Sequence, residues 1–187
     1  MPASGSRARV LARAFASLLA LGAIAAAPST AAAADRCPGA TSVPASGTRD
    51  DASAAVVCLV NAEREQRGLH RLHGDRRLHA VAVRQATDMV QRSYFSHVTP
   101  GGSDFGDRVR AAGYGRGHWW HAGETLAWGT QSRATPAVIV DEWLASPHHR
   151  DILLDPQYRE LAVGVAPGAP KRGVAGATYA AEFGVVH

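Results

Sequence analysis

The order of secondary-structure signals along the chain most limits the fold, because helical periodicity comes first and strand patterns come mostly later. Apolar residues at three- and four-residue spacing predict helices, and these are expected over 51–67, 75–92, 104–112 and 135–145. Strand patterns cover 123–128, 161–168 and 178–186, and the last two predict an antiparallel hairpin across a Pro/Gly turn. Helices that do not alternate with strands argue against a doubly wound parallel sheet and predict an α+β layered domain.

Length and composition are those of one globular domain. The chain has 187 residues, of which 46% are hydrophobic and 19% charged, and a domain commonly takes roughly 100–200 residues. This composition excludes a collagen, a coiled coil and a multispan membrane protein.

The first 34 residues predict a secretory signal peptide. Arg7, Arg9 and Arg13 precede the apolar run 14–27, and a small-residue stretch ends at Ala34. A membrane anchor is the alternative, but this run is shorter than the roughly 20 residues that span a bilayer. Cleavage near Ala34 leaves 17 basic and 16 acidic residues, so we expect a secreted, extracellular protein with no transmembrane segment and no nucleic-acid partner.

Two cysteines follow the predicted cleavage site. Cys37 and Cys58 are expected to form a disulfide, because paired cysteines are usual in exported proteins. The bridge would tie an N-terminal tether, residues 35–51, to a folded domain over 52–187. Closing a loop of about this length stabilises a fold by roughly 3 kcal/mol in the chain-entropy model.

Three short motifs carry residues suited to chemistry. His97 lies in YFSHVTPGG, Glu124 in AGETLAWG, and His148 and His149 in DEWLASPHHRDILLDP. Each has a structural alternative: a solvated loop histidine, a structural ion pair for Glu124, and a bystander role for one of the adjacent histidines. A buried Glu124 must be paired or hydrogen-bonded in either case.

Together with LVNAEREQRGL at 59–69, these motifs resemble the CAP domain family of cysteine-rich secretory, antigen-five and plant pathogenesis-related proteins, in its bacterial secreted branch. The resemblance covers about residues 54–187. It implies a three-layer α-β-α sandwich with a cleft at the loop and strand ends.

The resemblance also implies a cleft with two histidines and two glutamates. By motif these are His97, Glu124 and His149, whereas Ser146 stands three residues after Trp143, where the second glutamate is expected. Two further departures are His148, in place of the usual glycine, and Thr125, in place of the usual asparagine. Asp141 and Glu142 are near in sequence but are expected to point away.

The ligand types of His97, Glu124 and His149 suit zinc with an open fourth position, and equally suit a hydrogen-bonded structural cluster. No catalytic residue is assigned, because Ser96 and Ser146 lie beside or near a histidine without forming a triad. Family members bind divalent metals, a few are assigned protease activity, and most bind sterols, lipids or proteins.

We therefore expect a monomeric, non-catalytic binding module for a small apolar ligand, such as a lipid, or a cell-surface partner. It would need no cofactor, and zinc is the candidate metal. The alternative is a metal-dependent hydrolase that uses the same cleft. The helical arginines are expected on solvated faces; they are Arg64, Arg67, Arg76, Arg77 and Arg84.

Overall fold

The computed structural model describes residues 34–187, so the predicted signal peptide lies outside the described residues except for Ala34. The helices are α2 (Arg49–Gln66), α3 (Arg76–Arg92), α4 (Phe105–Ala111), α5 (Pro136–Ala145) and α6 (Pro147–Leu153), with a 3-10 turn over Gln131–Ala134. The strands are β1 (Trp120–Gly129), β2 (Glu160–Pro167) and β3 (Ala177–Val186).

The three strands form one antiparallel sheet in the order β1-β3-β2. The predicted β2–β3 hairpin is confirmed, and β1 begins at Trp120, three residues before its predicted start. Because β3 lies in the centre, it pairs residue by residue with both neighbours. Glu124 of β1 thereby comes opposite Glu182 of β3.

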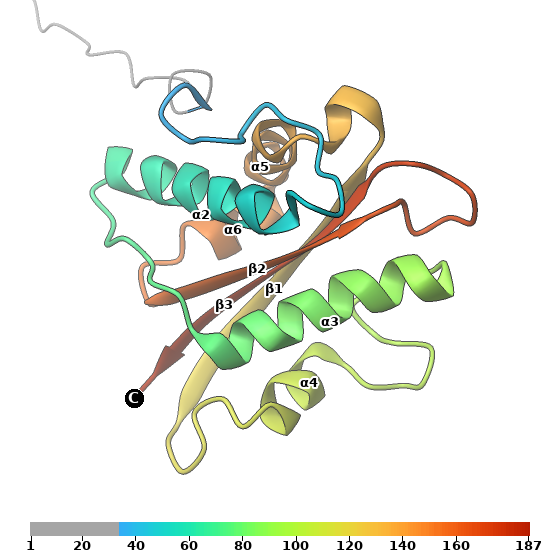
Figure 1. Cartoon of the computed structure of the whole chain (residues 1–187). Helices are drawn as coiled ribbons and strands as arrows, with labels where there is room; N and C mark the ends of the chain where they lie inside the picture. The colour runs from blue at the N-terminus through green and yellow to red at the C-terminus, as the bar shows by residue number, and fades with distance from the viewer. Residues whose placement is uncertain (1–33) are drawn as a thin grey trace, which may run out of the picture.

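Helices cover both faces of this sheet (Figure 1). Alternate strand residues, such as Val163 and Phe183, pack with α2, α5 and α6 in the larger core. The intervening residues, such as Ala162 and Ala180, pack with α3 and with the α4 region. The α+β class and the three-layer α-β-α sandwich are therefore confirmed.

On this face β2 carries only small residues beneath α3, namely Ala162, Gly164 and Ala166, which lets the helix approach closely. Gly164 of β2 is the tightest point, because an added Cβ would lie 2.2 Å from the carbonyl carbon of Ala82 in α3. Real side chains do not tolerate such a contact, so this position has room for glycine alone.

The disulfide between Cys37 and Cys58 is present, with Cα atoms 5.7 Å apart. It holds the N-terminal segment against α2. The Ala137 N–H also donates to the Ala40 carbonyl at 2.9 Å, which adds a tie to α5. No helix among residues 34–187 is both long and apolar enough to cross a lipid bilayer.

One helix, α6, was not predicted, and one expectation about local structure was wrong. Pro147 ends α5, as predicted, but it also occupies the first turn of α6, where its missing N–H costs nothing. Arg64 is fully buried rather than solvated, and its guanidinium donates to the carbonyl oxygens of His70, Leu153 and Asp155.

Candidate functional site

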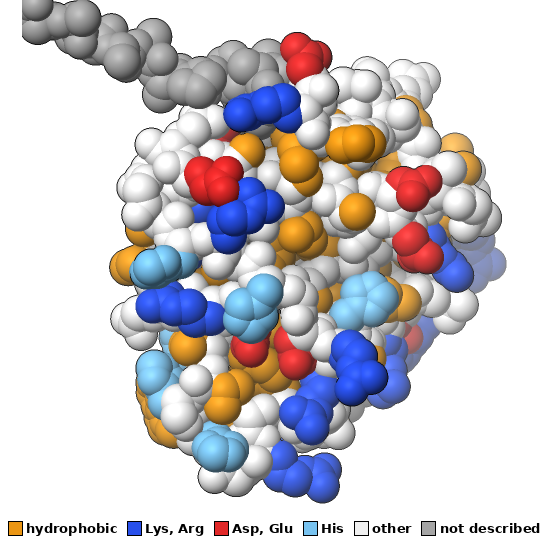
Figure 2. Space-filling model, turned by 60° about the vertical axis from the view of Figure 1, so that its left-hand side comes forward, with side chains coloured by type: hydrophobic (Ala, Val, Ile, Leu, Met, Phe, Trp, Pro, Cys, Tyr) orange, Lys and Arg blue, Asp and Glu red, His pale blue; other side chains and the backbone are white. Residues whose placement is uncertain are grey.

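The candidate cleft is built around Glu124, which β1 places 5% exposed on the sheet face that carries α3. Its Oε1 atom lies 2.6 Å from Nδ1 of His97, which belongs to the loop after α3. The His97 side chain is 52% exposed. Figure 2 shows the face on which histidine side chains gather around acidic ones.

The other carboxylate oxygen of Glu124 is held by Arg108 of α4. Arg108 Nη2 donates to Glu124 Oε2 at 2.6 Å, while Nη1 donates to the carbonyl oxygen of His97 at 2.8 Å. One arginine therefore fixes both the glutamate and the histidine loop. No sequence motif pointed to Arg108 as a site residue, although its position between the apolar Phe105 and Val109 was a signal that it faces inward.

Glu182 is the second glutamate of the site, and motif reasoning missed it. It is fully buried and stands opposite Glu124 in the β1–β3 register. Burial raises the pKa of Glu182 well above its ordinary value of 4.5, the charge of Glu124 raises it further, and Arg108 partly opposes this. Within residues 34–187 no donor bonds to either Glu182 oxygen, so a proton on Glu182 itself is the donor available to this carboxyl pair. The sequence feature that could have pointed to Glu182 is that it is the lone carboxylate in the apolar strand 178–186.

Replacing Glu182 with glutamine is expected to flatten the dependence of stability on pH. The folded state keeps the Glu182 proton while the unfolded state releases it above about pH 4.5, so this group lowers the free energy of unfolding as pH rises. Relative to the parent, the free energy of unfolding of Glu182→Gln should rise by up to about 1.4 kcal/mol for each pH unit above 4.5. Urea unfolding from pH 4 to 8 measures the difference.

The matched control for this series is Glu65→Gln, since Glu65 is half-exposed in a surface pair with Arg71. Parallel pH curves for the parent and Glu182→Gln would show that Glu182 ionises normally in the folded protein.

The remaining predicted residues lie around the α5–α6 junction. Ser146 joins the two helices, and His148 and His149 lie in the first turn of α6 with ring centroids 5.8 Å apart. His148 is exposed and His149 half-buried. Burial lowers the pKa of His149, and the charges of His148 and His97 lower it further. Asp141 is exposed, and Glu142 pairs with Arg133.

The arrangement does not fit a bound metal ion. Both Glu124 oxygens already contact His97 and Arg108, and a guanidinium repels a cation at the same carboxylate. Across the described part of the chain, no three His, Cys, Asp or Glu side chains form a group that could hold a metal. No chemical step is therefore assigned to a metal, and zinc binding stays a prediction.

Comparison with known proteins identifies a family match over most of the folded domain. The model of the cysteine-rich secretory protein family, CAP, matches residues 57–183. These residues include His97, Glu124, His149 and Glu182.

The individual matches are longer than this chain or more distant from it in sequence. The protein YkwD of Bacillus subtilis is 36% identical over 110 residues, which make up 58% of this chain and 40% of that protein. An extracellular protein of Bacillus anthracis containing an SCP domain superposes with a TM-score of 0.59 at 27% identity, over 72% of this chain and 40% of that one. An outer surface protein of Borrelia burgdorferi superposes with a TM-score of 0.58 at 19% identity, over 71% and 90%. This chain thus spans less than half the length of YkwD.

Proposed function

Because the chain belongs to the cysteine-rich secretory protein (CAP) family, we propose that it is an extracellular, non-catalytic binding module. Its ligand would be a small apolar molecule or a cell-surface partner held at the His97–Glu124 cleft. Export is supported by the Cys37–Cys58 disulfide and by the likeness to an extracellular protein.

The observation that carries the non-catalytic assignment is the state of Glu124. A general base must come within hydrogen-bond reach of the proton it removes, but the Glu124 side chain is only 2% exposed and both of its oxygens are in short contacts of 2.6 Å with His97 and Arg108. Ser96 Oγ accepts a hydrogen bond from the N–H of Val98. This contact stabilises a local turn of the loop. The cleft is thus described best as a rigid polar anchor.

Apolar side chains beside this anchor support an apolar ligand. Phe95 and Val98 flank His97 and are 45% and 46% exposed. Large apolar side chains in water are costly when they gather at one place, and such patches commonly mark binding sites. The patch and the polar cleft belong to the same loop.

The test uses N-phenyl-1-naphthylamine, a neutral apolar fluorophore, with mature protein purified from culture medium. We expect fluorescence enhancement that falls at least fivefold in the double variant Phe95→Ser/Val98→Ser. Val174→Ser is the control, because it removes a similarly exposed apolar side chain from the β2–β3 loop. It should leave the fluorescence enhancement unchanged. Organic extraction of the purified protein followed by mass spectrometry identifies any ligand carried from the medium.

Equal losses in the Phe95/Val98 and Val174 variants, or no enhancement in the parent, would contradict the proposal.

A zinc titration by calorimetry, with and without His149→Ala, adds a separate outcome. Zinc heat that His149→Ala abolishes and His148→Ala retains would overturn the metal-free description and favour the hydrolase alternative.

A further inference from the structure

A second surface lies between α3 and α4, beside the loop that carries Phe95, His97 and Val98. It is a groove of about 690 Å³, a size typical of ligand sites. Its apolar lining comes from Ala80 and Val81 of α3 and from Ala111 and Ala112 at the end of α4. We call it the arginine groove, because five arginines also line it: Arg76, Arg77, Arg84, Arg92 and Arg108.

Three of these arginines lack a counter-charge. Arg92 pairs with Asp88 at 3.5 Å, and Arg108 pairs with Glu124. Arg76, Arg77 and Arg84 are exposed, and no acidic side chain of residues 34–187 forms a salt bridge with them. Asp88 is the groove's one acidic lining residue in the described chain, and it is already engaged by Arg92 and by the Tyr94 hydroxyl. The groove therefore presents uncompensated positive charge over an apolar floor.

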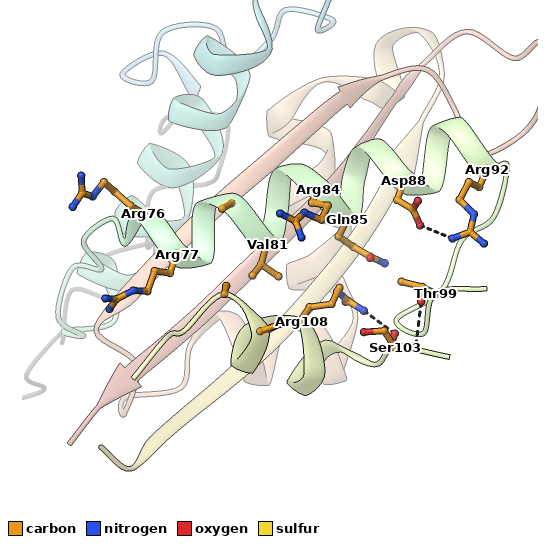
Figure 3. A pocket seen from close by; sticks show the side chains of 13 residues that line it. Arg76, Arg77, Val81, Arg84, Gln85, Asp88, Arg92, Thr99, Ser103 and Arg108 are labelled. Carbon is orange, nitrogen blue, oxygen red and sulfur yellow. Dashed lines mark hydrogen bonds and ion pairs between the residues drawn. The ribbon is translucent and has the colours of Figure 1, made fainter. Parts of the chain in front are cut away.

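The helix sets the spacing of this charge. Arg77 and Arg84 lie seven residues apart on the groove side of α3 (Figure 3), which corresponds to about 10 Å along a helix. A peptide in the polyproline II conformation has three residues per turn and rises about 3.1 Å per residue, so side chains at every third position lie on one side of it, about 9 Å apart. Acidic side chains at every third position would thus meet successive arginines, and guanidinium groups bind carboxylates in a fork geometry.

A buried amide in the groove wall distinguishes a peptide from a lipid chain. Gln85 is 1% exposed, its Nε2 donates to the Ser96 carbonyl at 2.9 Å, and its Oε1 has no donor among the described residues. Figure 3 shows its side chain extending from α3 toward the groove. A peptide brings N–H donors to this wall, whereas an acyl chain brings none.

We propose that the arginine groove binds an acidic peptide segment of a partner protein, with carboxylates spaced about three residues apart and apolar residues between them. This proposal does not rest on the apolar cleft ligand proposed above, although the groove shares Arg108 with the cleft.

The probe is a fluorescein-labelled nonapeptide with Glu at every third position and Leu and Ser between, measured by fluorescence anisotropy on the mature protein. Arg77→Glu/Arg84→Glu should weaken binding at least tenfold, and Arg77→Gln/Arg84→Gln should weaken it less. Lys171→Glu/Arg172→Glu makes the same charge change in the exposed β2–β3 loop and should leave binding within twofold. Circular dichroism verifies that each variant is folded.

Binding should also fall as salt rises, because the contacts are surface charges. Three results would overturn the proposal: no binding of the Glu peptide, equal binding of the same peptide with Lys in place of Glu, or equal weakening by the loop variant. Sedimentation with phosphatidylglycerol vesicles is the fourth arm. Vesicle binding that depends on Arg77 and Arg84, without peptide binding, would show that the partner of the groove is a lipid surface and not a peptide.

Discussion

Replacing Arg108 with methionine is expected to lower the free energy of unfolding by about 3–5 kcal/mol, the range for removing one partner of a buried ion pair. The side chains of Arg108 and Glu124 are only 9% and 2% exposed. Without the guanidinium, the buried Glu124 carboxylate is left with His97 and the neighbouring Glu182 carboxyl beside it. Urea unfolding at pH 7 measures the loss.

A double variant separates lost charge balance from lost packing. Arg108→Met combined with Glu124→Gln removes the uncompensated charge, so it should recover at least half of the stability lost by Arg108→Met alone. Arg108→Lys keeps the charge but lacks the guanidinium group that reaches both Glu124 and the His97 carbonyl. Its free energy of unfolding should lie between those of Arg108→Met and the double variant. If Arg108→Met costs less than about 1 kcal/mol, the pair behaves like an exposed one and does not organise the cleft.

Replacing Gly164 with alanine is expected to cost at least about 3 kcal/mol, the upper part of the range for overpacked cores. The added Cβ would meet backbone atoms of Ala82 and Val83 at 2.2–2.3 Å, and backbone cannot rotate aside as a side chain can. Either α3 must move away from the sheet or β2 must shift. Thermal unfolding followed by circular dichroism measures the effect.

Gly74 provides the matched control, because a Cβ there meets nothing within 4 Å. Gly74→Ala should change stability by no more than about 0.5 kcal/mol, as at ordinary surface positions. Similar unfolding temperatures for the two alanine variants would mean that α3 does not rest against Gly164.

Local patterns predicted most of the fold, since helices such as α3 and the β2–β3 hairpin follow from periodicity and turn residues. They failed where one residue has two roles, as at Pro147, which ends one helix and begins another. The site was harder because it depends on strand register. Glu182 and Glu124 are 58 residues apart, and only the pairing of β1 with β3 brings them together. The motif search instead sought the second glutamate near Trp143.

The contact between Gly164 and α3 also bears on how the arginine groove would bind a partner. Backbone packed against backbone leaves the helix little freedom to slide or rotate, so Arg77 and Arg84 project from a fixed platform. Association is costly when a surface must be ordered first, and a surface that is already ordered avoids that entropic penalty. Gly164, on the buried side of α3, thus helps to preorganise the solvent-facing side of the same helix. A Gly164 variant in which α3 is loosened should bind the acidic peptide more weakly, although every groove residue is still present.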